Sequence, residues 1–280
     1  MNPITSTERV IHLGNGLRLT IDERGDATGS PGTGVLLLHS GAGPLTIAGL
    51  AAALSEHAYV VTPTHPGFNG TPRVPWLDSA ADLADAYLDL LAELGLDSVM
   101  VIGNSVGGWV AAEMALRDIE GRITSMVLLD ANGIRPDNAA QVTDIRGLDP
   151  AAIGRLSFYN PALRPDPGAM SQEQLATMAA NQQTLAVYAG EDFMFAPKLR
   201  GRLHRVSVPV LVAWGEEDGI VTADYGRSYA AAFPNGRFTP IAEAGHFPQI
   251  EQPAAVLAAI GDFAASVAAV SQAGSAGDVA

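Results

Sequence analysis

Short apolar runs alternate with longer amphipathic stretches along the first half of the chain. Residues 35–38, 99–102 and 126–129 are continuous apolar runs, a pattern typical of strands that are buried on both faces. Residues 79–94 place leucine and tyrosine at helical spacing, and residues 106–117 resume the helical pattern. This alternation predicts an α/β fold built around a mostly parallel sheet.

Both ends of the chain extend this predicted sheet. Residues 10–13 and 17–22 are short β-type runs joined by Gly14-Asn15-Gly16, which predicts an antiparallel hairpin. Further strands are predicted at 59–62, 208–214 and 237–241, and further helices at 46–57, 223–233 and 253–270. The pattern therefore predicts a central sheet of about eight strands flanked by helices.

The alternation breaks between residues 131 and 206, where proline, aspartate, methionine and aromatic residues lie in irregular helical stretches. We predict helices near residues 150–158 and 171–189 in this segment, and no buried strand. The predicted division is a first core part (1–130), an inserted segment (131–206) and a second core part (207–270). Residues 271–280 are small and polar, so we expect a disordered tail there.

The composition excludes several classes of function. The chain has 280 residues, with 30 acidic residues against 16 basic ones and a formal net charge of −14. Nucleic acids and anionic membrane surfaces would be repelled by this charge, so we expect neither as a partner. Cysteine is absent, which excludes a disulfide and a thiolate nucleophile.

No apolar stretch resembles a signal peptide or reaches the roughly 18 uninterrupted apolar residues of a spanning helix. We therefore expect a soluble, cytoplasmic protein whose partner is a small-molecule substrate. A homodimer remains open.

The most informative motif is Gly103-Asn104-Ser105-Val106-Gly107, which lies between a predicted strand and a predicted helix. A serine on so tight a turn has a strained backbone, and the flanking glycines leave room where a Cβ atom would collide. The hydroxyl is presented at the end of the sheet, next to amides at a helix N-terminus that can stabilise an oxyanion. This arrangement predicts a nucleophilic serine.

From residue 17 to residue 263 the chain resembles the α/β-hydrolase superfamily. Besides the serine motif, residues 39–44 (His-Ser-Gly-Ala-Gly-Pro) resemble the oxyanion loop of the family, with Ser40 where glycine is usual. Residues 66–71 resemble its Pro-Gly-x-Gly-x-Ser loop with one residue more between the glycines, and Thr64 replaces a frequent Asp before it. The resemblance implies an α/β-hydrolase fold in which residues 131–206 form a small helical lid over the serine.

The resemblance also implies a catalytic triad of Ser105, Asp218 and His246. A serine hydroxyl needs an adjacent base that is itself oriented by a third group. Asp218 follows the strand predicted at 208–214, and His246 follows the last predicted strand, in the order serine, acid, histidine that this fold uses. For the acid, Glu216, Glu217 and Asp130 are alternatives.

The backbone amides of Gly41 and Val106 are the predicted oxyanion donors, with Ser40 as an alternative. We expect His39 to pack beneath this loop. The other histidines lack the spacing of metal ligands, and no Gly-rich nucleotide fingerprint joins a strand to a helix, so neither a metal nor a cofactor is predicted.

Apolar side chains of residues 131–206 are candidates for an acyl or alcohol pocket. The predicted substrate-binding residues are Ser40, Asn104, Phe158, Tyr159, Phe193 and Phe247. Further candidates are Met170, Met178, Tyr188, Met194 and Phe195, although each of these residues could instead attach the lid to the core.

The function expected from these residues is a serine hydrolase that cleaves a small, mainly apolar carboxylic ester or lactone through an acyl-serine intermediate. An alternative is hydrolysis of a carbon–carbon bond in ring-fission diketones or dienoates. The chain resembles enzymes of that kind at Asn104, at the loop of residues 41–44 and at Gln249. It differs from them at Phe247, where those enzymes often have Trp. Haloperoxidase-like relatives share the triad, and a non-catalytic binding protein of this fold is a further alternative.

Overall fold

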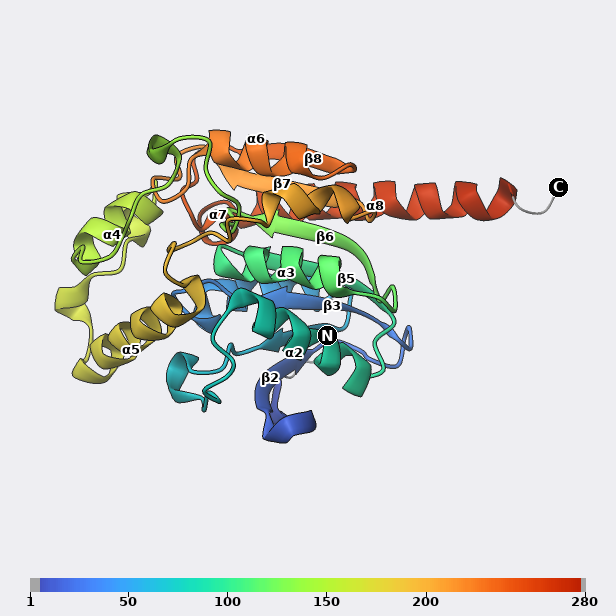
Figure 1. Cartoon of the computed structure of the whole chain (residues 1–280), viewed down its shortest axis with the longest axis horizontal. Helices are drawn as coiled ribbons and strands as arrows, with labels where there is room; N and C mark the ends of the chain where they lie inside the picture. The colour runs from blue at the N-terminus through green and yellow to red at the C-terminus, as the bar shows by residue number, and fades with distance from the viewer. Residues whose placement is uncertain (1–5, 278–280) are drawn as a thin grey trace.

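The computed structural model describes residues 6–277, and these build one eight-stranded sheet with helices on both faces (Figure 1). The strands are β1 (Thr7–His12), β2 (Arg18–Arg24), β3 (Thr33–Leu38), β4 (Val60–Pro63), β5 (Ser98–Asn104), β6 (Ile123–Leu129), β7 (Val210–Gly215) and β8 (Gly236–Ile241). Their order in the sheet is β1-β2-β4-β3-β5-β6-β7-β8. β1 and β2 form an antiparallel hairpin, β2 also pairs antiparallel with β4, and the remaining pairs are parallel. The predicted mostly parallel sheet is confirmed.

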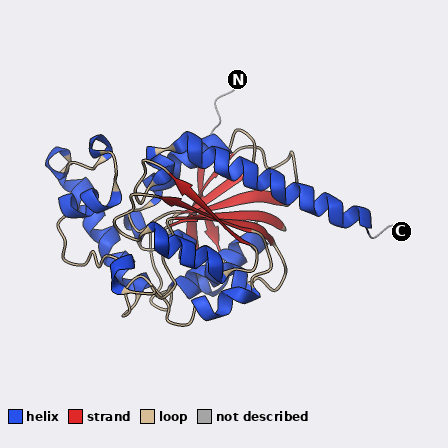
Figure 2. Ribbon diagram, turned by 90° about the horizontal axis from the view of Figure 1, so that it is seen from above, coloured by secondary structure: helices blue, strands red, loops and turns tan. Residues whose placement is uncertain are grey.

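Two apolar cores lie on opposite faces of the sheet, because successive side chains of a strand point to opposite sides. In β3, Leu36 and Leu38 belong to one core and Val35 and Leu37 to the other. The helices are α1 (Ala48–Leu54), α2 (Ala80–Glu93), α3 (Val106–Arg117), α4 (Pro150–Ser157), α5 (Gln172–Ala189), α6 (Ala223–Ala232), α7 (Pro248–Glu251) and α8 (Pro253–Gly277). α2, α3 and α6 cover the first core, while α1 and α8 cover the second (Figure 2).

The carboxyl ends of β3 and β5 form a switch point in the topology. These strands are neighbours, with Leu38 opposite Gly103, yet the chain leaves β3 towards α1 on one face and leaves β5 towards α3 on the other. Loops that diverge in this way open a crevice at the sheet edge, which is where ligands bind in open α/β sheets. The Ser40 loop and Ser105 both lie at this edge.

Residues 131–206, the predicted lid, add no strand to the sheet. They contain α4, α5 and short 3₁₀ turns, and they lie beyond the carboxyl ends of the strands (Figure 1). α5 begins with a capping box, in which the Ser171 hydroxyl accepts the Gln174 amide and the Gln174 side chain accepts the Ser171 amide. We call residues 131–206 the cap segment.

The C-terminal helix differs from the prediction. α8 continues to Gly277, past its expected end near residue 270 and into the predicted disordered tail; residues 278–280 lie outside the described part. Alanine and glutamine favour a helix here, and no proline interrupts it.

By length and composition alone, α8 is apolar enough to cross a membrane over Pro253–Val270, where the mean hydropathy is 1.8. No such segment was expected from the sequence. Much of this hydropathy comes from alanine, and Val256, Ile260 and Phe263 pack on the sheet as part of the second core. Only 17% of this apolar window is buried inside the protein, so most of it faces outward. The absence of a membrane partner stays a prediction.

Two buried histidines pack beneath the loop that follows β3, as expected for His39. The rings of His39 and His65 lie 3.8 Å apart between centroids, and both side chains are fully buried. The His65 amide donates to His39 Nε2 at 2.9 Å, so the His39 proton lies on Nδ1, which donates to the Ser40 carbonyl at 2.6 Å. His65 Nε2 donates to the His39 carbonyl at 2.9 Å, and its Nδ1 accepts from the Tyr87 hydroxyl at 2.5 Å. Both rings are therefore neutral.

This burial makes stability depend on pH. Burial lowers the pKa of His65 from the ordinary 6.5 to about 4, and burial followed by the neighbouring His65 lowers the pKa of His39 well below its usual range. As pH falls below 6.5 the unfolded chain binds protons on both imidazoles, whereas the folded chain does not until His65 titrates near pH 4. The stabilisation that neutral His65 contributes is complete above pH 6.5 and is lost between there and about pH 4. The contribution of His39 falls in the same direction below pH 6.5.

We expect the free energy of unfolding to fall by up to about 1.4 kcal/mol per pH unit for each histidine in that window. Denaturant unfolding at several pH values measures this slope. His65→Gln should reduce it, while His12→Gln, at an exposed position of β1, should leave it unchanged. Equal slopes for wild type and His65→Gln would contradict the neutral buried pair.

Candidate active site

Ser105 lies on a tight turn between β5 and α3. Its backbone has φ 55° and ψ −120°, a region that costs a non-glycine residue about 1–3 kcal/mol. Gly103 and Gly107 make the turn possible: a Cβ atom on Gly107 would lie 2.4 Å from the Leu38 carbonyl oxygen, and one on Gly103 would lie 2.3 Å from the Gly107 backbone. The turn therefore presents the Ser105 side chain at the N-terminus of α3.

Asp218 and His246 form a buried hydrogen-bonded pair. His246 Nδ1 lies 2.7 Å from Asp218 Oδ2, while Asp218 Oδ1 accepts the amides of Ile220 at 2.7 Å and Val221 at 3.1 Å. Because the Asp218 carboxylate accepts all three hydrogen bonds, the imidazole proton lies on Nδ1 and Nε2 has a free lone pair. Of the alternative acids, Glu216 and Glu217 are exposed, whereas Asp130 is buried next to Asp218.

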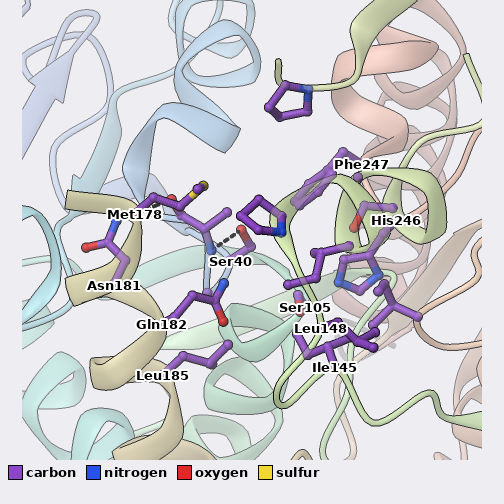
Figure 3. A pocket seen from close by; sticks show the side chains of 18 of the residues that line it. Ser40, Ser105, Ile145, Leu148, Met178, Asn181, Gln182, Leu185, His246 and Phe247 are labelled. Atoms are coloured by element: carbon purple, nitrogen blue, oxygen red, sulfur yellow. Dashed lines mark hydrogen bonds between the residues drawn. The ribbon is translucent and has the colours of Figure 1, made fainter. Parts of the chain in front are cut away.

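Ser105 and His246 line the same cavity, and Figure 3 shows the imidazole facing the serine. No hydrogen bond joins the two side chains in this structure. Such contacts are often long without substrate and tighten when it binds.

Of the two predicted oxyanion amides, one belongs to Gly41 in the cavity wall and the other to Val106, the residue after Ser105. Neither the Gly41 amide nor the Val106 amide donates a hydrogen bond within residues 6–277, whereas the Ala42 amide is bound to the Ser40 hydroxyl at 3.1 Å. Gly41 lines the cavity, and Val106 is the first residue of α3. A Cβ atom on Gly41 would lie 2.5 Å from the end of the Leu185 side chain of α5, so a larger residue in this loop would require that side chain to move.

The cavity has a volume of about 320 Å³ and is mainly apolar. Figure 3 shows Met178, Gln182 and Leu185 entering it from α5, opposite Ile145 and Leu148. Its polar lining side chains are Ser40, Ser105, Ser157, Asn181, Gln182 and His246. Among the lining residues of the described chain there is no lysine, arginine, aspartate or glutamate.

Half of the predicted substrate-binding residues reach this cavity. Ser40, Phe158 and Phe247 line it, and the two phenylalanine rings lie 5.1 Å apart between centroids. Tyr159 is 46% exposed outside the cavity, and Phe193 packs under the Arg146 guanidinium, 4.6 Å from the ring centroid.

Asn104 is the third residue that lies away from the cavity. Its amide nitrogen donates to the carbonyls of Leu129 at 3.0 Å and His246 at 3.2 Å, and its oxygen accepts from Gln249 Nε2 at 3.2 Å. Gln249 Nε2 also donates to the Thr46 carbonyl at 3.1 Å. This buried amide network joins the loops of Ser105, His246 and Ser40, and it was not predicted from the sequence.

One face of α5 docks on the core loop of residues 66–71. The Asn69 amide donates to Asn181 Oδ1 at 2.9 Å, Thr184 donates to the Gly67 carbonyl at 3.0 Å, and Tyr188 donates to the Pro66 carbonyl at 2.8 Å. The cavity-lining positions Leu175, Met178, Gln182 and Leu185 recur at helical spacing on α5. That spacing is visible in the sequence and could have identified α5 as a cavity wall.

A second contact joins the cap segment to the His246 loop. The His246 amide donates to the Ser157 carbonyl at 2.8 Å, at the end of α4. Glu251 of α7 accepts the amides of Gly245 at 2.6 Å and Asn160 at 2.7 Å. The loop that presents His246 is thus built partly from cap residues.

Asp130, Asp218 and His246 are also the described group whose ligand atoms, all within 4.8 Å of one another, could hold a metal ion. The bond between His246 Nδ1 and Asp218 Oδ2 and the two amides on Asp218 Oδ1 already occupy both oxygens of Asp218 and one nitrogen of His246. The geometry fits a hydrogen-bonded acid–imidazole pair with an additional carboxyl group better than it fits a metal site.

Comparisons with known proteins agree with this architecture. The model of the alpha/beta hydrolase family matches residues 35–259. The chain is 29% identical over 240 residues to the pimeloyl-(acyl-carrier protein) methyl ester esterase of Aromatoleum aromaticum, covering 78% of this chain and 93% of that protein. It is 25% identical over 252 residues to the 2-hydroxy-6-oxo-6-phenylhexa-2,4-dienoate hydrolase of Burkholderia cepacia, covering 79% and 83%.

Among solved structures, a thermophilic esterase from Thermogutta terrifontis superimposes with a TM-score of 0.71 at 25% identity, over 93% of this chain and 99% of the esterase. The family match spans most of the chain, from β3 into α8. The chain therefore belongs to the alpha/beta hydrolase family.

Proposed function

We propose that this hydrolase cleaves small, uncharged, mainly apolar carboxylic esters through an acyl-Ser105 intermediate. The observation that carries the proposal is one apolar cavity of about 320 Å³ that holds Ser105 and His246 together, with His246 bound to Asp218 at 2.7 Å. The curated esterase relative supports ester chemistry.

In the proposed reaction each group has its own role. Ser105 Oγ attacks the ester carbonyl while His246 Nε2 takes its proton, and Asp218 stabilises the imidazolium that forms. The amides of Gly41 and Val106 bind the carbonyl oxygen as it becomes negative. His246 then gives its proton to the leaving alcohol, and a water molecule that it activates releases the acid from Ser105.

The cavity lining favours an uncharged substrate over a dienoate. The Burkholderia cepacia relative acts on a dienoate, which carries a carboxylate, and such a group would need a cationic or multiply hydrogen-bonding partner in an apolar cavity. Among the described residues that line this cavity there is no lysine or arginine. Carbon–carbon bond hydrolysis is therefore the second candidate, and the Burkholderia cepacia relative supports it.

A role in binding without catalysis is the third candidate. The strained φ of Ser105 argues against it, since backbone strain of this kind is retained where the chemistry uses it.

Ser105→Ala tests the nucleophile. We expect it to lower kcat for short p-nitrophenyl esters by at least about a thousandfold, because the alkoxide attack is lost while the fold remains. Ser30→Ala, at an exposed position between β2 and β3, is the matched control and should keep the wild-type rate. Retained turnover in Ser105→Ala would exclude the acyl-serine mechanism, and failure of a fluorophosphonate probe to label Ser105 would favour the binding role.

A pair of esters tests the substrate class. We expect kcat/KM to be about a hundredfold lower for the mono-p-nitrophenyl ester of a dicarboxylic acid than for the neutral ester of equal length, because the carboxylate would be buried without a partner.

Met178→Lys places a cation on the cavity face of α5 and should reduce the difference in kcat/KM between the neutral and the charged ester. Gln183→Lys adds the same charge at an exposed position of the same helix and should leave that difference unchanged. Equal kcat/KM for the two esters in the wild type would contradict the uncharged-substrate assignment and favour the dienoate candidate.

A further inference from the structure

Asp130 is a buried carboxyl group that the proposed mechanism does not use. It follows β6 directly, has no exposed surface and has φ 46°. Oδ1 accepts the Gly215 amide at 2.9 Å, whereas the buried Oδ2 accepts a hydrogen bond from no donor group of the described chain. An unpartnered buried carboxylate oxygen is costly, so its protonation state requires an explanation.

Three titratable groups face Asp130 from the elements packed around it. Asp218 comes from the loop after β7 and His246 from the loop after β8, and one ligand atom of each lies within 4.8 Å of an Asp130 carboxyl oxygen. Glu251 of α7 adds a further negative charge, although its own oxygens accept the amides of Gly245, Tyr159 and Asn160.

Two carboxyl groups this close in a buried site do not both ionise. Asp218 accepts three hydrogen bonds, one of them from the imidazole, whereas Asp130 accepts a single one. The negative charge is therefore better stabilised on Asp218, and the proton belongs on Asp130. Burial and, next, the charge of Asp218 raise the pKa of Asp130 well above its usual range, which agrees with this assignment.

We propose that Asp130 is a positioning residue that stays a neutral carboxylic acid and donates its Oδ2 proton to the Asp218 carboxylate. This inference rests on the proposed function, in which Asp218 orients His246. The bond gives Asp218 a fourth donor, which completes the acceptor capacity of a carboxylate. It also leaves a single negative charge beside His246, so that the imidazole can remain a neutral base.

Asparagine and alanine at position 130 differ in whether they keep the hydrogen bonds to Gly215 and Asp218. Asp130→Asn would keep both contacts, since the amide oxygen can accept from Gly215 and the NH₂ group can donate to Asp218, and asparagine tolerates a positive φ. We expect Asp130→Ala to lower kcat by about tenfold with little change in KM, because one hydrogen bond to a charged group is lost. Asp130→Asn should recover most of this loss.

The acid limb of the pH profile of kcat/KM distinguishes a neutral Asp130 from an ionised one. With a neutral Asp130, the limb of Asp130→Asn keeps its wild-type position. If Asp130 were ionised, removing its charge from beside His246 would move the limb to lower pH by about two units. Such a shift would overturn the proposal.

Infrared difference spectroscopy tests the protonation state without relying on activity. We expect the wild type to show the C=O band of a protonated carboxylic acid at neutral pH, and Asp130→Asn to lose it. Asp26→Asn, at an exposed position where hydrogen bonds from Thr28 lower the pKa of Asp26, should lose only carboxylate absorption.

Ser105→Ala should keep the carboxylic-acid band even though it lacks turnover, so failure of the proposed function and failure of this inference are distinguishable. Absence of a carboxylic-acid difference between wild type and Asp130→Asn would refute the neutral Asp130.

Discussion

Helix α3 begins in direct contact with the end of β3, and this close approach constrains the whole site. A Cβ atom at position 107 would lie 2.4 Å from the Leu38 carbonyl oxygen, so the helix can start here only because Gly107 has none. The chain must then turn at Ser105 with a positive φ, which costs conformational energy. Contacts around the turn offset this cost: the Ser105 amide donates to the Leu129 carbonyl at 2.9 Å, and Asn104 binds the carbonyls of Leu129 and His246. The hydrogen bonds of Asn104 thus help to hold the strained backbone of Ser105 in place.

The sequence predicted the core of the fold well because its signals are local. Each buried strand is a continuous apolar run, and the helix after Ser105 begins and ends at the predicted residues. The end of α8 was not predicted, since alanine-rich sequence carries no apolar periodicity to mark where a helix leaves the core.

The direction of their side chains explains why three of the predicted substrate-binding residues lie away from the cavity. Phe158 and Tyr159 are adjacent aromatic residues at the end of α4, yet Phe158 lines the cavity and Tyr159 faces solvent. Phe193 has a positive φ, at 43°, that no local pattern announces, and it packs under Arg146. Asn104 was predicted to bind substrate, but a strand alternates its side chains, and this one points into the interior. The direction of each side chain depends on tertiary contacts, and the chemical type of a single residue does not predict them.

The contacts of the cap segment affect how the protein can acquire new specificity. One face of α5 lines the cavity while its adjacent face holds the loop of Gly67 and Asn69, and the end of α4 holds the loop of His246. Replacing the cap with that of a relative would therefore change more than the shape of the cavity, since it would also remove supports of the loops on either side of Ser105. Evolution at this site is expected to proceed by exchange of single cavity-facing side chains, because wholesale replacement of the lid would require compensating changes in the core.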